Sequence, residues 1–285
     1  MKFSPKRLIL AAAAMACATQ AASAALAFTN GDLILGFQAT AGTGSTQNVF
    51  FNLGSPIAYR NGTNPSGTIG NINTTLTSVY GANWYTREDL YFGVVANLNG
   101  NANTGAGNRG VVNGDPSRTF YLSTAAATPG SGNLYGASSY TSSSLGSAGT
   151  SLGGLEGIFP NLNTEADGAA ILSQSTQPTE WNNGWTAKNI PGGAAFGVFT
   201  GGIQQNFGKM SNSTYVDLQR VVSTNNTNTG TGYDGSTAVA GVIGGGTYET
   251  TFAISNTGNI SAIPEPSTTL LGALGVIALL RRRRA

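Results

Sequence analysis

Short stretches in which apolar and polar side chains alternate most constrain how this chain can fold. In residues 32–40, Leu33, Leu35 and Phe37 are two apart and therefore share one face of an extended strand. A strand with one apolar face is stable only when another element covers that face, so many short strands are expected to pack together. The comparable stretches are 89–98, 118–124, 247–255 and, with less regular alternation, 215–222.

Glycine and asparagine mark the turns between these stretches. Pairs such as Asn61-Gly62 and Asn113-Gly114 accept the left-handed backbone that tight turns require. Another turn is expected at 256–259, before a last short strand. We therefore predict a mainly β fold, an antiparallel β-sandwich or jelly-roll-like single domain with long Gly/Ser/Asn-rich loops.

Two short helices and one long loop interrupt the β pattern. A helix is expected at 73–80, where apolar side chains share one helical face and Gly81 follows. A second helix is expected to begin at Thr164, with Asp167 completing a capping box. Residues 125–154 are rich in Ser, Gly, Ala and Thr, and we interpret them as a long loop.

The chain has few reactive side chains. It has no histidine, and its one cysteine is Cys17, so Ser-His-Asp triads, Cys-His dyads, histidine-based zinc sites and a disulfide within residues 28–263 are excluded. That span holds seven of the 14 basic and 11 of the 12 acidic residues, a net charge of −4. A mildly acidic body without basic clusters argues against nucleic acid as a partner. We also expect no cofactor.

Carboxylates are the remaining catalytic candidates. A glycosidase needs two carboxyl groups about 5–10 Å apart across a cleft. The available acids do not single out a pair by their spacing; they are Glu88, Asp89, Glu156, Glu165, Asp167 and Glu180. Solvated surface acids explain them better, so we expect no catalytic activity.

Calcium is a weaker possibility. Glu165, Asp167 and Asp234 lie beside turns, where oxygen ligands can converge. The sequence has no Asp-x-Asp-x-Asp ladder, and turn chemistry alone explains Asp234 before Gly235. We therefore expect no metal site.

Three tryptophans offer a binding function. Trp84, Trp181 and Trp185 lie near Asn and Gly residues, and an exposed indole is a good platform for a sugar ring. In a small β core, however, a tryptophan more often serves packing than ligand contact. A carbohydrate-binding module that uses exposed tryptophans is therefore the alternative hypothesis.

The N-terminal residues 1–27 have the composition of a secretory signal peptide. Basic residues precede a short apolar run at 8–16, which is too short for a retained membrane anchor. Ala22-Ser23-Ala24 and Ala25-Leu26-Ala27 both fit the small-residue cleavage pattern. We expect the chain to be exported.

The C-terminal residues 263–285 combine three elements. Two prolines around Glu265 favour extended backbone, and the uncharged stretch 267–280 follows them. As a helix, that stretch spans about 21 Å, which is less than the roughly 30 Å of a hydrocarbon core. Arginines resist translocation and stay on the cytoplasmic side. The pattern predicts a short transmembrane helix that holds the exported chain transiently at the inner membrane, followed by the membrane stop Arg281, Arg282, Arg283 and Arg284.

In order and spacing, these elements resemble the PEP-CTERM sorting signal of bacterial exported proteins. The resemblance implies that Pro264, Glu265 and Pro266 form the sorting motif. It also implies recognition by exosortase, a membrane-embedded cysteine transpeptidase. The destination that it implies is the cell surface or an extracellular polysaccharide matrix.

Parts of the body resemble the same group of proteins. Residues 31–37, 49–54 and 80–87 are similar to the N-terminal half of exported proteins that carry this signal and have no assigned activity. The similarity supports the localisation and implies no mechanism.

The sequence thus predicts three regions: a signal peptide (1–27), an exported β-rich domain (28–262) and a PEP-CTERM sorting signal (263–285). We expect an exported surface or exopolysaccharide-associated matrix protein without catalytic activity. Deleting the four arginines is expected to change its processing and surface retention.

Overall fold

A computed structural model describes the folded body of the chain. It covers residues 26–62, 65, 67–98, 119–135, 149, 152–188, 207–211, 214–221 and 246–263, with the backbone of four two-residue strands between 103 and 116. The strands are β1 (Leu33–Ala39), β2 (Gln47–Gly54), β3 (Thr68–Asn71), β4 (Leu90–Leu98), β5 (Asn103–Thr104), β6 (Asn108–Arg109), β7 (Val111–Val112), β8 (Asp115–Pro116), β9 (Thr119–Ala126), β10 (Ala170–Ser173), β11 (Gly208–Lys209), β12 (Tyr215–Val221), β13 (Gly246–Ile254) and β14 (Asn259–Ile263). The helices are α2 (Asn73–Tyr80), α4 (Pro178–Trp181) and α5 (Trp185–Lys188), with 3-10 helices η2 (Pro56–Gly62), η3 (Trp84–Thr86) and η4 (Phe159–Asn161), and residues 152–156 are also helical.

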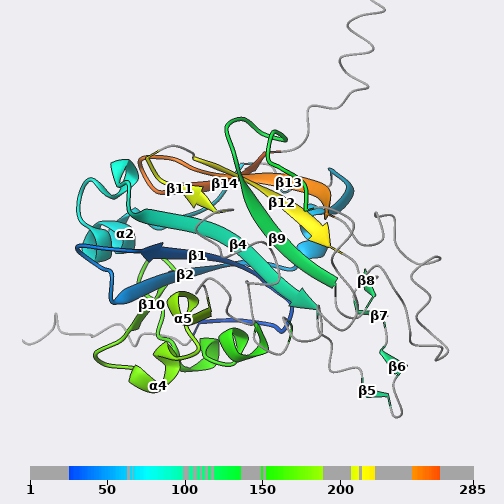
Figure 1. The fold of residues 1–285 in the computed structure, drawn as a ribbon, viewed down its shortest axis with the longest axis horizontal. Helices are drawn as coiled ribbons and strands as arrows, with labels where there is room; N and C mark the ends of the chain where they lie inside the picture. The colour runs from blue at the N-terminus through cyan, green and yellow to red at the C-terminus, as the bar shows by residue number, and fades with distance from the viewer. Residues whose placement is uncertain are drawn as a thin grey trace, which may run out of the picture.

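The main strands form one antiparallel sheet that curls on itself. The strand order is β10-β2-β1-β4-β9-β12-β13-β14-β3, and β11 pairs with β4 beside this path. Figure 1 shows the sheet rolled into a half-barrel, with β1, β2 and β4 across from β12, β13 and β14. The predicted mainly β antiparallel fold is confirmed. One curled sheet, however, replaces the two facing sheets of the predicted sandwich. The predicted apolar helix at 267–280 lies outside the described residues.

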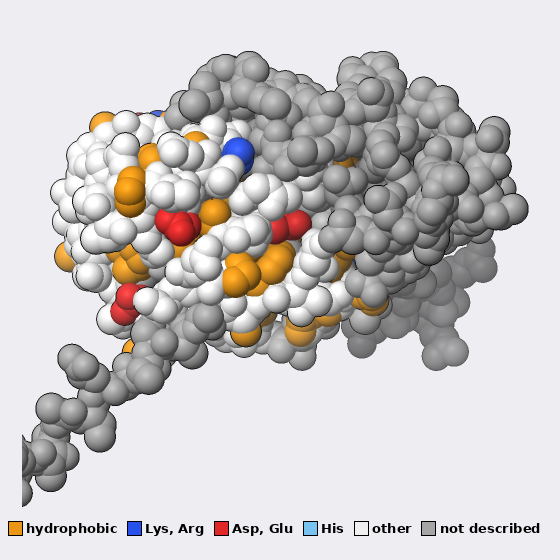
Figure 2. All heavy atoms as spheres, turned by 90° about the horizontal axis from the view of Figure 1, so that it is seen from below, with side chains coloured by type: hydrophobic (Ala, Val, Ile, Leu, Met, Phe, Trp, Pro, Cys, Tyr) orange, Lys and Arg blue, Asp and Glu red, His pale blue; other side chains and the backbone are white. Residues whose placement is uncertain are grey.

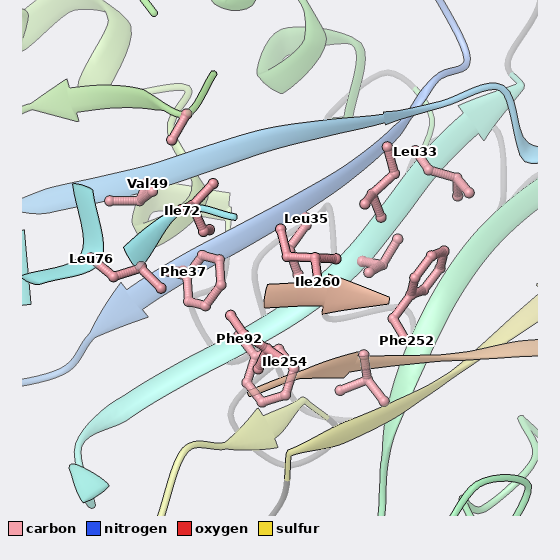
Figure 3. Close-up of a cluster of buried hydrophobic side chains, with 14 of the residues drawn as sticks. Leu33, Leu35, Phe37, Val49, Ile72, Leu76, Phe92, Phe252, Ile254 and Ile260 are labelled. Carbon is pink, nitrogen blue, oxygen red and sulfur yellow. The ribbon is translucent and has the colours of Figure 1, made fainter. Parts of the chain in front are cut away.

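The concave face of the sheet encloses the larger hydrophobic core. Leu33, Leu35 and Phe37 of β1 are buried and belong to it. Figure 3 shows Phe252 of β13 and Ile260 of β14 approaching them from the other side of the half-barrel. Because strands twist relative to their neighbours, a long sheet can curl until its two halves face each other. Side chains from the two halves of one sheet thus form the concave core together.

Six strands of the main sheet lie where the sequence predicts them. β1, β4, β9, β12 and β13 match the five predicted stretches to within two residues, and β14 follows the predicted turn. The sequence did not single out β2, because Val49, Phe50 and Phe51 form a continuous apolar run. Val49 faces the concave core and Phe50 belongs to a second core on the convex face, so β2 is buried on both sides.

Aromatic side chains connect β2, β3 and β13 across the open side of the half-barrel. Phe51 of β2 packs over Gly70 of β3, where an added Cβ atom would lie 2.5 Å from the ring. Tyr59 of η2 packs edge-on against Phe252, with ring centroids 5.0 Å apart. The Tyr59 hydroxyl also donates a 2.8 Å hydrogen bond to the carbonyl oxygen of Leu53. These side-chain contacts cover the concave core on the side where no hydrogen bonds between strands close the sheet.

Helix α2 is capped by a side chain from a distant part of the chain. The Asp167 carboxylate accepts hydrogen bonds from the Thr75 N–H (2.9 Å) and the Thr75 hydroxyl (2.7 Å). A carboxylate there satisfies a free N–H group and favours the positive end of the helix. The helix predicted at 73–80 is confirmed. The helix predicted from Thr164 is wrong, because Thr164 forms a β-bridge with Ala170 and Asp167 caps α2 instead.

The convex face of the sheet is covered by residues 152–188. Figure 1 shows α4 and α5 below β1 and β2, with α5 beside β10. In this cover the Trp185 ring lies beside that of Phe207, with centroids 5.4 Å apart. Beneath them are Gly36 of β1 and Gly93 of β4, which are cross-strand partners. A Cβ atom would lie 2.5 Å from Trp185 on Gly36 and 2.3 Å from Phe207 on Gly93, so the glycine pair makes room for both rings.

Buried polar side chains of β12 bind residues 127–135 to the sheet. Asp217, which is 1% exposed, accepts hydrogen bonds of 3.1 and 2.7 Å from two glycine N–H groups of this segment. Gln219 accepts a 2.8 Å hydrogen bond from the Tyr135 N–H. Buried polar groups of this kind are stable only when hydrogen-bonded. The described beginning of the predicted loop 125–154 is therefore held against the sheet.

We predict that Gly36→Ala destabilises the protein by about 1–3 kcal/mol, because the added methyl group would overlap the Trp185 ring. Urea unfolding of the exported protein measures the change. The matched control is Gly153→Ala in the helical turn 152–156, where an added Cβ meets nothing within 4 Å. The control should be neutral or slightly stabilising. Equal stability of the two variants would contradict the packing described above.

Candidate functional site

The described body ends at the residue before the predicted sorting motif. β14 pairs with β13 as far as Ile263, which lies opposite Thr251. Ala262 is buried in the concave core, and the Thr250 hydroxyl donates a 3.3 Å hydrogen bond to the Ile263 carbonyl oxygen. Proline has no N–H group and cannot continue a strand ladder as a donor, so β14 ends where Pro264 begins.

The remaining residues of the predicted signal are not part of the described body. Pro264, Glu265 and Pro266, the stretch 267–280 and the arginines 281–284 all lie outside the described residues. Among the helices that the structure describes, none has the length and apolar character needed to cross a membrane.

The three tryptophans are buried. Trp84 and Trp185 are 0% exposed and Trp181 is 9% exposed. The Trp84 Nε1–H donates a 3.2 Å hydrogen bond to the side-chain oxygen of Asn73 at the start of α2. The alternative hypothesis of exposed indoles is therefore wrong, and the packing role that the sequence analysis favoured is confirmed. Nearby Asn and Gly residues indicate turns, but the rings point into the two cores, where a sugar cannot stack on them.

Two of the candidate catalytic carboxylates have structural explanations. Glu88 precedes β4, is 76% exposed and accepts a 2.6 Å hydrogen bond from the Lys209 ammonium group. Glu180 lies in the first turn of α4, where a negative charge suits the helix end. These positions agree with the interpretation of surface acids.

Arg87 and Asp89 form a clamp on the loop between β1 and β2. The Arg87 guanidinium donates to the carbonyl oxygens of Ala41 (2.8 Å), Thr43 (2.6 Å) and Tyr80 (2.9 Å). It also donates twice to the Asp89 carboxylate, at 2.9 and 2.6 Å. This hydrogen bonding holds the pKa of Asp89 below its usual value and raises that of Arg87. Arg87 therefore fixes backbone, and both side chains are used structurally.

A buried ion pair joins β12 and β13. Nε of Arg220 lies 3.0 Å from Oε1 of Glu249, and each side chain is 2% exposed. Arg220 follows Val216 and Leu218 at two-residue spacing, and both of those face the concave core. Removing one partner of such a pair leaves an uncompensated buried charge, which is strongly destabilising. Sequence analysis did not identify this pair, because no local pattern links the two residues.

Glu156 has a strongly raised pKa. Its side chain lines a cavity of about 10 Å³, together with Asp32, Val95, Leu155 and Phe159 among others. Burial raises the pKa of Glu156 to about 8, against an ordinary value of 4.5. A hydrogen bond from the backbone of Asn97 opposes the shift, and the negative charge of Asp32 adds to it. The sequence offered Glu156 as one acid among several, with no sign that it is buried.

The geometry around Glu156 does not favour catalysis. A carboxyl group with a raised pKa beside a second carboxylate is typical of acid–base sites. This cavity, however, has room for about one water molecule and none for a sugar ring. Asp32 is also engaged, because it accepts hydrogen bonds from the Thr29 N–H (2.8 Å) and the Asn52 side chain (2.9 Å). Glu156 is best explained as a partly buried acid of the convex core.

The structure gives no support to a calcium site. Among the described residues there is no group of three or more acidic, Cys or His side chains that could hold a metal ion. Asp167 is engaged with Thr75, and Asp234 lies outside the described residues.

We predict that Glu156 makes the protein less stable as the pH rises. Below about pH 4.5 Glu156 is protonated in the folded and the unfolded state, so it does not change the free energy of unfolding. Between about pH 4.5 and 8 the unfolded state releases the proton more readily, so the free energy of unfolding falls as the pH rises. Above about pH 8 the carboxyl group is ionised in both states and the destabilisation is complete. A pKa unit corresponds to about 1.4 kcal/mol, and partial solvent exposure lowers the total to a few kcal/mol.

Urea unfolding at about pH 5 and about pH 8.5 tests this prediction. Glu156→Gln should be more stable than the wild type at the higher pH and should show a flatter pH dependence. Glu88→Gln, which alters a largely exposed acid, is the matched control and should keep the wild-type slope. An unchanged slope in Glu156→Gln would refute the assignment.

Comparison with known proteins identifies the C-terminal segment. Residues 262–284 match the family model of the PEP-CTERM protein-sorting motif. The match begins at Ala262, inside β14, and includes the Pro-Glu-Pro motif, the uncharged stretch and the arginines. No curated protein and no solved structure matches the chain. The chain therefore carries a PEP-CTERM sorting motif at residues 262–284, which supports sorting through exosortase.

Proposed function

We propose that this chain is an exported, non-catalytic protein of the cell surface or extracellular matrix that associates with exopolysaccharide. The PEP-CTERM motif indicates export and sorting through exosortase, a membrane enzyme. The observation that carries the proposal is the position of the motif, which starts in the last strand of a folded body. The folded body is the part that is exported, and the C-terminal tail is its sorting signal.

The tail suits a temporary tether at the inner membrane. Its 14 uncharged residues, 267–280, span about 21 Å as a helix and so fall short of a hydrocarbon core of about 30 Å. The arginines that follow resist translocation. Only three residues separate Ile263 from the apolar stretch, and the four residue steps from 263 to 267 span about 14 Å when extended. The tethered body therefore stays close to the membrane surface until the tail is cut.

The chemistry of the described residues supports a non-catalytic role. Glu88 is paired with Lys209, Asp89 with Arg87, and Glu249 with Arg220. The cavity beside Glu156 accommodates about one water molecule. In this part of the chain, acids therefore serve ion pairs, caps and packing.

The surface supports association with a hydrated polymer. Figure 2 shows one face of the body on which charged side chains are few and separate, hydrophobic ones form small patches, and most of the area is uncharged. Charged residues are 9% of the sequence, against about 25% in an average protein. Amide and hydroxyl groups can exchange hydrogen bonds with sugar hydroxyls without the desolvation cost of charges.

We predict that replacing Arg281, Arg282, Arg283 and Arg284 with serine lowers the processed, surface-located fraction several-fold, because the membrane stop is lost. Cell fractionation and mass spectrometry of the mature C-terminus measure this. The wild type should retain Ile263, which is paired in the sheet, and should end at or shortly after Pro264. Replacement by four lysines keeps the charge and is the matched control. An intact Ala285 at the wild-type surface, or normal processing of the serine variant, would contradict the proposal.

We predict that removing the producer's polysaccharide enzymatically releases the mature protein, whereas raising the salt concentration from about 0.1 to 1 M leaves most of it bound. Salt screens contacts between charges over a Debye length of about 10 Å at 0.1 M and 3 Å at 1 M, and this body has few charges. Immunodetection in matrix and medium fractions gives the readout. Release by salt alone would point to an ionic partner instead.

A further inference from the structure

The first described residues are part of the folded body. Leu26 is 5% exposed and belongs to the convex core. Its N–H donates a 2.9 Å hydrogen bond to the carbonyl oxygen of Leu162 in the cover. The carbonyl oxygen of Ala27 accepts a 2.7 Å hydrogen bond from the Asn52 side chain of β2. Residues 26 and 27 thus connect the cover to the sheet.

The neighbouring contacts strengthen this connection. The Asn52 amide that binds Ala27 also donates to Asp32, at 2.9 Å, so it holds the segment beside the start of β1. Phe28 packs edge-on against Phe159, with ring centroids 4.8 Å apart. Phe159 in turn packs against Phe50 of β2, and the centroids of these two rings are 5.4 Å apart. The segment is therefore integrated into the convex core.

The two small-residue cleavage patterns have different consequences for these contacts. A cut after Ala27 would remove Leu26 and both hydrogen bonds of residues 26 and 27. It would also place a new ammonium group on Phe28, which packs against the core. A cut after Ala24 keeps all of these contacts.

We propose that the export peptidase cuts between Ala24 and Ala25, so that the mature body begins at Ala25 and not at Phe28. Water hydrolyses the peptide bond, leaving a carboxylate on Ala24 and a free amine on Ala25. Ala22-Ser23-Ala24 supplies the small residues that such a peptidase requires. The inference rests on the proposed export, and it moves the end of the signal peptide from residue 27 to residue 24.

The mature N-terminus tests the proposal directly. Intact mass and N-terminal sequencing of the exported full-length product should show Ala25 as the first residue. A chain that begins at Phe28, three residues lighter, would overturn the proposal. A chain that retains Met1 would overturn it too, and it would show that the proposed export itself had failed.

Substitutions in the two patterns give a second test. Ala24→Leu places a large residue at the proposed cleavage position and should block the cut there. Ala27→Leu, the matched variant, does the same for the alternative pattern and should be processed like the wild type. Normal processing of Ala24→Leu together with a block in Ala27→Leu would assign the cut to Ala27.

Leu26→Ala supplies a third measurement that does not depend on blocking the peptidase. It leaves the small residues of both patterns unchanged. If the mature chain begins at Ala25, the loss of a buried leucine should lower its folding equilibrium constant by roughly a hundredfold in urea unfolding. If it begins at Phe28, the mature product is identical to the wild type and its stability cannot change. Ala27→Ser, at an exposed position, is the control and should unfold like the wild type.

Discussion

A single sheet that must bury both of its faces is the constraint on which the rest of this structure depends. Every residue of β1 is buried, because Leu33, Leu35 and Phe37 face the concave core while Ile34 and Gly36 face the convex one. The concave face is covered by the curl of the sheet itself. The convex face needs separate material, which residues 152–188 supply. With no disulfide available to the body, this double burial has to provide most of its stability.

The same constraint explains how far the sequence could predict the fold. Alternation in 32–40 reports one apolar face, and it predicted β1 well. It could not show that the other face is also buried, because Ile34 is its one large apolar residue: Gly36 carries no side chain and Gln38 is polar. Gly36 and Gly93 acquire their role only as cross-strand partners beneath Trp185 and Phe207. That role depends on a pairing between distant strands, which a local pattern does not contain.

The candidate sites were misjudged for a related reason. Asp167 lies at capping-box spacing from Thr164, yet it caps α2 through Thr75, which is 92 residues away. The tryptophans lie among turn residues, yet their rings point inward. No local sequence pattern indicated the Arg220–Glu249 ion pair, because the two residues lie on different strands. The C-terminal signal was predictable because it is defined by consecutive residues and not by contacts between distant ones. Prolines, an apolar stretch and arginines follow one another in the sequence.

The side chains described in 31–37, 49–54 and 80–87 are mainly structural in this fold. The Tyr80 hydroxyl donates a 3.0 Å hydrogen bond to the Phe37 carbonyl oxygen, and burial raises the pKa of Tyr80, so the hydroxyl keeps its proton. Arg87 clamps the adjoining loop through three carbonyl oxygens. Tyr80 and Arg87 therefore join the end of α2 to β1 and to the loop between β1 and β2.

The distribution of charge links this body to its route of export. Four of the 14 basic residues are consecutive arginines at the tail, whereas the seven of the body are spread between residues 60 and 220. On the proposed export route, arginines resist translocation most effectively beside an apolar membrane segment, and the terminal cluster lies directly after the uncharged stretch 267–280. The body instead uses its basic residues singly, and three of them, Arg87, Lys209 and Arg220, are paired with carboxylates. Sparse charge within the body and a cluster of arginines beside the apolar stretch therefore agree with the proposed transient arrest at the membrane.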